Sequence, residues 1–149
     1  MHQHDKLYIG GQWVPSTGSG SIEVVNPSTE ETIGSVPEGT TADVDAAVAS
    51  ARGTFESWAA TPVEQRAELV GKLGEAIGAQ MGEIGELIAS EVGMPIKLSG
   101  RVQAGLPAGV TSSTAKLALE FPFEERIGST LVVKEPIGVV GCITPWNFP

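Results

Sequence analysis

Residues 136–143, with the sequence PIGVVGCI, restrict the fold of this chain more than any other stretch. They are almost all apolar and lack the alternating polar side chains of a strand with one face in water. Such a run is typical of a strand that is buried on both faces of a parallel sheet. Parallel strands need long crossover connections, which are usually helices. The chain is therefore predicted to belong to the α/β class.

The first forty residues are predicted to form β-hairpins. LYI and QWV flank Gly10-Gly11, a glycine pair that suits a two-residue turn. SIEVV and ETIGSV follow, separated by the turn-prone NPST.

A helix is predicted over 41–59, where a threonine precedes the first turn and Asp43 and Asp45 lie near the positive end of the helix dipole. Its apolar residues recur at helical spacing, so one face is expected to be buried. These residues are Val44, Ala47, Val48, Ala51, Phe55 and Trp58.

The next helix is predicted to begin at Thr61-Pro62-Val63-Glu64, which places a capping hydroxyl, a first-turn proline and a reciprocal glutamate in order. It continues to Gly93 and Pro95 as one long helix or as two placed end to end. A column of glycines runs along it: Gly71, Gly74, Gly78, Gly82 and Gly85. The column has two interpretations. The glycines could allow another helix or strand to approach closely, or they could lie on a surface face that tolerates glycine, with a break in the helix near Gly82.

A third helical stretch is predicted from near Leu98 to Glu120, with Gly105 and Pro107 leaving its start open. FPFEERI and STLVVKE then predict a hairpin over 123–135, with charged residues on one side. Its free edges favour pairing with another chain.

Charge and composition exclude several classes of function. The net charge of −9 repels phosphate backbones and anionic membrane surfaces, so we expect no nucleic-acid partner. No signal segment and no run of the roughly 18 apolar residues that a membrane span needs is present. The one cysteine cannot form an internal disulfide, and no Cys or His cluster has metal-ligand spacing. We therefore expect no membrane partner, no metal, and a cytoplasmic location.

The polar residues that follow the apolar run are the candidate site. In open α/β sheets, ligands bind at the carboxyl ends of strands, where Thr144, Pro145, Trp146 and Asn147 lie. EPIGVVGCITPWNFP resembles the stretch that leads into the first cofactor-domain strand of NAD(P)-dependent aldehyde dehydrogenases. YIGGQWV, VVNPSTEETIGSVP, DVDAAVASAR, TPVEQR and LIASEVGMP also resemble that family, in the same order.

The resemblance implies roles for five residues. Asn147 would donate its amide hydrogen bond to the oxyanion that forms when a cysteine thiolate attacks an aldehyde; from the residues alone, it could equally cap the turn before Pro149. Ile143, Thr144, Pro145, Trp146 and Asn147 would line the site for NAD or NADP, although Ile143 and Trp146 could also be plain core residues. Cys142 is expected to pack inside the buried strand and not to be the nucleophile, because no basic residue is near in sequence to lower its thiol pKa.

The resemblance implies an N-terminal part of an aldehyde dehydrogenase-like fold. Residues 1–122 would form N-terminal β-hairpins and a helical layer of the cofactor-binding domain, 123–136 an oligomerisation-type hairpin, and 137–149 the first strand of an incomplete parallel cofactor-binding sheet. The intact enzyme would be a homo-oligomer that oxidises an aldehyde through a cysteine thiohemiacetal. The 149 residues alone are expected to be inactive, since the nucleophile and the base lie elsewhere in the family. The alternative is a non-catalytic assembly module that pairs through the 123–135 hairpin with another chain.

Overall fold

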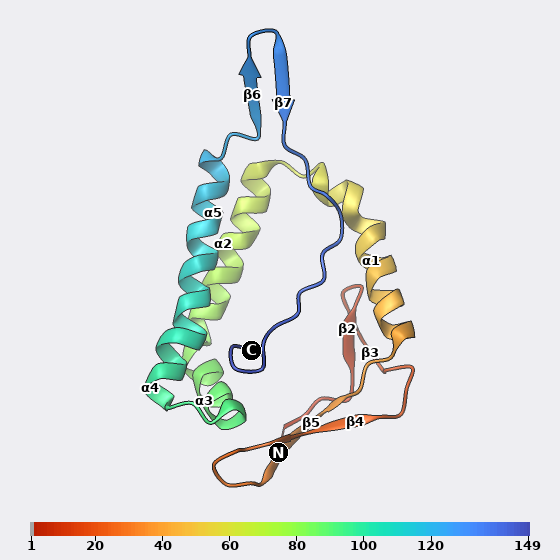
Figure 1. Ribbon diagram of the computed structural model, residues 1–149, viewed down its shortest axis with the longest axis vertical. Helices are drawn as coiled ribbons and strands as arrows, with labels where there is room; N and C mark the ends of the chain where they lie inside the picture. Colours follow the sequence, from red (N-terminus) through yellow and green to blue (C-terminus); the bar gives the residue numbers. More distant parts are fainter. Residues whose placement is uncertain (1) are drawn as a thin grey trace.

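The computed structural model describes residues 2–149 and arranges them as three small sheets beside a layer of helices (Figure 1). The elements are β1 (His2–Gln3), β2 (Leu7–Ile9), β3 (Gln12–Val14), β4 (Ser21–Val25), β5 (Thr32–Pro37), α1 (Thr41–Ala59), α2 (Val63–Ala79), α3 (Met81–Val92), α4 (Ile96–Leu98), the π-helix η1 (Ser99–Gly105), α5 (Leu106–Glu120), β6 (Glu124–Ile127) and β7 (Thr130–Val133). Among the described residues, every helix is too short or too polar to cross a membrane.

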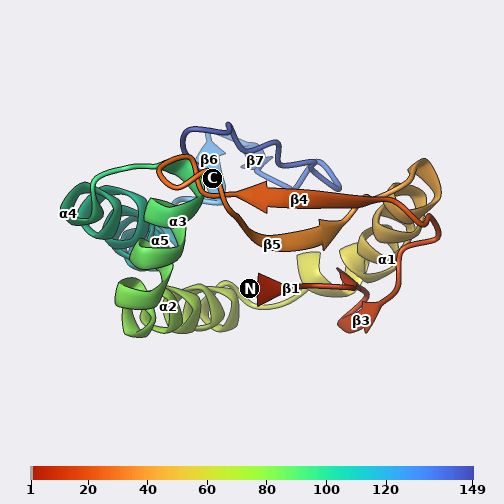
Figure 2. The same ribbon diagram turned by 90° about the horizontal axis from the view of Figure 1, so that it is seen from below.

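The two predicted N-terminal hairpins are confirmed. β2 and β3 pair antiparallel around Gly10 and Gly11, whose φ angles of 60° and 78° match the turn that such a glycine pair favours. β4 and β5 also pair antiparallel, and β1 adds to β5 in parallel, which the sequence did not predict. Figure 2 shows the β4–β5 pair between α1 and the α2, α3 and α5 helices.

The start of α1 is a complete capping box. The Asp43 N–H donates to the Thr40 hydroxyl at 3.3 Å, and the Thr40 N–H donates back to the Asp43 carboxylate at 2.9 Å. The Ser16 hydroxyl and the Thr17 N–H also donate to this carboxylate, at 2.7 and 2.9 Å. These bonds explain why Asp43 is buried, and the Thr40 N–H is the main cause that holds its pKa far below the usual range. We call these bonds of Ser16, Thr17 and Thr40 to the Asp43 carboxylate the Asp43 clasp. The clasp joins the segment after β3 to the start of α1.

The predicted burial of the apolar face of α1 is wrong. Val44 is 59% exposed and Trp58 is 47% exposed, and the one buried side chain of the helix is Asp43. The physical reason is that α1 packs mainly against β2, so no described element covers the aliphatic face. Helical spacing predicted the helix correctly, but it does not predict whether another element covers the apolar face.

The segment after α1 forms two helices, α2 and α3, which meet at Gln80. The predicted cap at Thr61 is wrong: α2 begins after Pro62 without a side-chain cap. The Thr61 hydroxyl instead donates to the Ser57 carbonyl at 3.0 Å, because it is used to close the end of α1.

Glycines and small residues make the contact between α2 and α5. A Cβ on Gly74 would lie 2.6 Å from the Ser112 hydroxyl oxygen, and one on Gly85 of α3 would lie 2.9 Å from the Cα of Gly100. Gly78 and Gly82 face open space. The close-approach interpretation therefore holds at Gly74 and Gly85, and the permissive-surface interpretation holds at Gly78 and Gly82.

The third helical stretch runs from Ile96 to Glu120 as α4, η1 and α5. The π-helix was not predicted. It ends just before Pro107, which has no N–H to donate to the carbonyl four residues earlier. It lies against α3, where the Ser99 hydroxyl donates to the Gly85 carbonyl at 2.7 Å.

The predicted hairpin over 123–135 is confirmed as β6 and β7, which pair antiparallel across Gly128 and Ser129. Both strands are exposed along their whole length. In Figure 1 the hairpin projects beyond the ends of α2 and α5.

The strand predicted over 137–149 is not formed, which corrects that part of the prediction. Residues 134–149 form neither a helix nor a strand, and none of the described strands pairs with them. A strand needs hydrogen bonds from a neighbouring strand, so an apolar run without a partner remains irregular. Ile137 is consequently 96% exposed.

Candidate functional site

The predicted site residues lie on the last part of the chain, after the β6–β7 hairpin. In Figure 1 this segment runs back from β7 between α1 and the α2–α5 pair, and it ends near α3. Ile143 is 98% exposed and Trp146 is 88% exposed, while Thr144, Pro145 and Asn147 are also exposed. The structure therefore brings the five residues together on one accessible stretch, and the interpretation of Ile143 and Trp146 as core residues does not hold here.

A turn shapes the end of this stretch. The Phe148 N–H donates to the Pro145 carbonyl at 3.1 Å, so Trp146 and Asn147 occupy the two central positions of the turn. The turn presents an indole and a carboxamide side by side in sequence.

One side chain from the helical layer holds this turn. The Nε2 atom of Gln103, in η1, donates to the backbone carbonyl of Asn147 at 3.0 Å across 44 positions of sequence. Gln103 is buried, with only 6% of its surface exposed. Sequence reasoning missed this residue, and its one signal was a neutral amide between Val102 and Ala104 in a predicted helix.

Cys142 does not lie where it was predicted. It is exposed, because the segment that carries it has no sheet neighbours among the described strands. The prediction that Cys142 packs inside a buried strand is therefore wrong in this structure.

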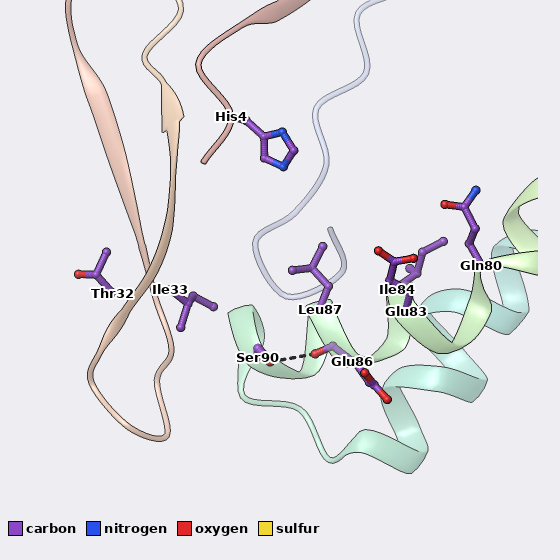
Figure 3. A pocket seen from close by; sticks show the side chains of 9 residues that line it. All are labelled: His4, Thr32, Ile33, Gln80, Glu83, Ile84, Glu86, Leu87 and Ser90. Atoms are coloured by element: carbon purple, nitrogen blue, oxygen red, sulfur yellow. Dashed lines mark hydrogen bonds between the residues drawn. The ribbon is translucent and has the colours of Figure 1, made fainter. Parts of the chain in front are cut away.

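A hollow with a volume of about 700 Å³ lies elsewhere, between β5 and α3 (Figure 3). Its walls include Ile33 from β5 and Ile84 and Leu87 from α3. The Ser90 hydroxyl on its rim donates to the carbonyl of Glu86 in its own helix. None of the five predicted site residues lines it.

The chemistry of the exposed stretch is that of a neutral binding surface. The Asn147 carboxamide can donate two hydrogen bonds without changing its protonation state, and the Trp146 indole and the Thr144 hydroxyl add further donors. Such a set can stabilise a developing negative charge or bind hydroxyl groups, but it contains no acid, base or nucleophile.

Comparison with known proteins decides the family. The family model described as "Aldehyde dehydrogenase family" matches residues 13–149. The chain belongs to the aldehyde dehydrogenase family. Its α/β fold is the N-terminal part of the aldehyde dehydrogenase fold, as the sequence predicted.

Curated and structural relatives agree with this assignment. The chain is 40% identical over 150 residues to a 3-succinoylsemialdehyde-pyridine dehydrogenase of a Pseudomonas species, covering 100% of this chain and 31% of the relative. The crystal structure of a cysteine-to-alanine mutant of aldehyde dehydrogenase C of Pseudomonas syringae, complexed with NAD+ and octanal, matches with a TM-score of 0.94 and 39% identity. That match covers 97% of this chain and 30% of the relative.

A Mycobacterium tuberculosis aldehyde dehydrogenase complexed with NAD+ matches with a TM-score of 0.92 and 36% identity, over 99% of this chain and 32% of the other. This aldehyde dehydrogenase chain therefore spans about a third of the length of the relatives it matches.

Proposed function

We propose that these residues are the N-terminal portion of an NAD(P)-dependent aldehyde dehydrogenase, which oxidises an aldehyde to a carboxylic acid. The observation that carries the proposal is the exposed PWNFP turn, which presents the Asn147 carboxamide in a chain that matches the family over 13–149. We further propose that the enzyme is a cytoplasmic homo-oligomer. In it, residues 1–122 would belong to the cofactor-binding domain, 123–136 would form the oligomerisation hairpin, and 137–149 would join the cofactor-binding sheet beside other strands of the intact enzyme.

Asn147 is the catalytic residue of this portion. When a cysteine thiolate attacks the aldehyde carbon, the carbonyl π electrons move to oxygen, and the resulting oxyanion needs a fixed donor. A neutral amide supplies this without a proton transfer, and one such donor is typically worth about 3 kcal/mol of transition-state stabilisation.

The stretch from Ile143 to Asn147 fits one wall of a nicotinamide cofactor site. Thr144 and Asn147 offer neutral donors for ribose hydroxyls, and the exposed Ile143, Pro145 and Trp146 offer apolar surface to a flat ring. When bound, NAD or NADP would accept the hydride of the aldehyde. Solved relatives complexed with NAD+ support use of such a cofactor.

Residues 1–149 alone are expected to be inactive. Covalent aldehyde oxidation requires a thiolate that attacks and a base that activates water for hydrolysis of the thioester. Cys142 lies five residues before Asn147 on the same exposed segment, and we assign it neither role.

The proposal can be tested with a hybrid protein in which residues 1–149 replace the matching residues of the Pseudomonas syringae enzyme. The hybrid should form NADH from octanal and NAD+. Asn147→Ala should lower kcat about 100- to 1000-fold. The matched control is Asn26→Ala, because the Asn26 carboxamide accepts from the Ser28 N–H in the β4–β5 turn, away from the site. Hybrid proteins with Asn26→Ala or with Cys142→Ser should form NADH as fast as the unmodified hybrid.

A folded hybrid without aldehyde oxidation would contradict the enzyme assignment. Equal activity of Asn147→Ala and Asn26→Ala would contradict the oxyanion role. NADH formation by residues 1–149 alone would contradict their expected inactivity.

The second candidate function is a non-catalytic assembly module. It is favoured by the β6–β7 hairpin, whose strands are exposed and whose outer edges pair with no described strand. The chain should then co-elute with a full-length relative at micromolar concentration, and separate elution would count against this role.

A further inference from the structure

The peptide unit between Asn147 and Phe148 is held at both of its polar atoms. Its N–H, which belongs to Phe148, donates to the Pro145 carbonyl at 3.1 Å. Its C=O, which belongs to Asn147, accepts from Gln103 Nε2 at 3.0 Å. Because a carbonyl only accepts, the nitrogen of the Gln103 amide must face it. Two bonds on opposite ends of one planar unit fix the orientation of that plane.

The Gln103 side chain projects from a firmly held base. Its neighbour Ala104 and Ser99, in the same π-helix, have no exposed surface. The Ser99 hydroxyl donates to the Gly85 carbonyl at 2.7 Å, which joins η1 to α3. Gly85 and Gly100 approach so closely that a Cβ on Gly85 would lie 2.9 Å from the Cα of Gly100. A small movement of η1 is therefore resisted by backbone contacts.

By contrast, the residues of the turn are exposed. Among residues 2–149, the bond from Gln103 is the side-chain hydrogen bond that reaches the 137–149 segment. Trp146 is 88% exposed, so its ring does not anchor the turn by packing. The direction in which the Asn147 side chain leaves the backbone depends on the peptide plane that Gln103 holds.

We propose that Gln103 is a positioning residue: its buried amide orients the Asn147–Phe148 peptide and thereby aims the Asn147 carboxamide at the oxyanion. This inference rests on the proposed role of Asn147. π-Helical segments are frequent at functional sites, where the extra residue per turn displaces a side chain from its α-helical direction. Here the π-helix contributes the side chain whose hydrogen bond reaches the turn. A neutral donor also makes the positioning independent of pH.

The first test uses the 149-residue chain. Gln103→Met keeps the side-chain volume but removes the donor, and the Phe148 amide should exchange its hydrogen about five-fold faster in NMR experiments. The matched control is Gln80→Met, because Gln80 Nε2 donates to the Ala76 carbonyl at the end of α2 and not to the turn. Gln80→Met should leave the Phe148 amide unchanged. Equal Phe148 exchange rates in Gln103→Met and wild type would overturn the proposal.

The second test uses the hybrid protein with octanal and NAD+. Gln103→Met should lower kcat about ten-fold, because a donor that is misplaced by a fraction of an ångström stabilises the oxyanion less well. The KM values and the shape of the pH profile should not change. Adding Gln103→Met to Asn147→Ala should cause no further loss, since the misplaced group is already absent.

The failures of the two proposals are distinguishable. If Asn147→Ala retains full kcat, the oxyanion role fails, whatever Gln103→Met does to Phe148 exchange. If Asn147→Ala loses activity but Gln103→Met does not, the positioning role fails alone. Losses that multiply in the double variant would mean that Gln103 acts through general stability, and they would also overturn the positioning role.

Discussion

The helical layer and the 134–149 segment differ in how they are held. In the helical layer, α2, α3, η1 and α5 approach through small residues, and Ala67, Ile88, Ala104 and Ala115 are buried. The 134–149 segment carries larger apolar side chains, yet Ile143 is 98% exposed. Apolar character therefore does not decide burial here; the presence of a covering neighbour does.

The difference places the proposed site on the less constrained part of the chain. Asn147 and its neighbours lie on the exposed segment, whereas Gln103, the residue that we propose orients them, lies in the packed layer. If Asn147 is the oxyanion donor, its position thus depends on a contact between the two regions. Changes made in the helical layer alone, or in the 134–149 segment alone, should show which region determines stability and which determines local exposure.

The largest expected contrast is in amide hydrogen exchange. The amides of residues 138–144 form no backbone hydrogen bond in the structure, whereas those of α5 lie in a helix that packs on α2. In the 149-residue chain, 138–144 should exchange at least about 100-fold faster than the amides around Ala115. Exchange resolved by mass spectrometry measures this. Slow exchange in 138–144 would mean that the apolar run has found a partner, and it would contradict the exposed placement.

A single methyl group should distinguish the close contacts of the helical layer from its open face. Gly85→Ala places a Cβ 2.9 Å from the Cα of Gly100, a backbone atom, and should lower the free energy of unfolding by about 2 kcal/mol. Gly82→Ala is the matched control in the same helix, because nothing lies within reach of its Cβ. It should instead stabilise by about 0.5–1 kcal/mol.

Urea unfolding followed by helical circular dichroism measures both variants. A stabilising Gly85→Ala would show that η1 can move away from α3. It would also weaken the argument that η1 is a firm base for Gln103.

Local chemistry could be predicted from the sequence, and long-range packing could not. The glycine turn at Gly10-Gly11 and the hairpin over 123–135 formed as expected, because the residues that specify them are adjacent in sequence. The predicted cap at Thr61 was wrong for a related reason. Thr61 lies between α1 and α2, and its hydroxyl donates to the Ser57 carbonyl of α1 instead of capping α2. Nothing in the local pattern decides between the two.

The faces of elements were the least predictable feature. The apolar face of α1 and the run at 136–143 were expected to be buried, but burial depends on covering elements that the local pattern does not specify. For the candidate site, the motif predicts Asn147 and its neighbours directly, and their roles stay a prediction. The contact from Gln103 spans 44 positions and arises in a π-helix, whose register an α-helical period cannot predict.

The hydrogen bonds at Asp43 should make the stability of the N-terminal region depend on pH. The pKa of this carboxyl is lowered in the folded state, chiefly by the Thr40 N–H, so its stabilising contribution is fully present above the ordinary value of 3.8. The contribution is lost as the pH falls below that value, because the unfolded chain takes up a proton that the folded chain resists. Asp43→Asn should therefore lower the melting temperature at neutral pH, and the difference from wild type should narrow in acid.

Asp45→Asn is the control for this measurement, because Asp45 is exposed one residue beyond Val44 on the same helix. It should melt close to wild type throughout. If the melting temperature of Asp43→Asn stays below that of wild type by the same amount in acid, the clasp acts through its hydrogen-bond geometry and not through the charge of Asp43.

The smallest effect is expected at the ion pair on the outer face of α2. Lys72 Nζ donates to Glu68 Oε1 at 2.6 Å, which lowers the pKa of Glu68 and raises that of Lys72. Both side chains are 64% exposed, so water and salt screen the attraction. Lys72→Gln should lower the melting temperature slightly at low ionic strength and not measurably at high ionic strength. A loss as large as that of Gly85→Ala would mean that surface charge, and not the close contacts of small residues, holds the helical layer together.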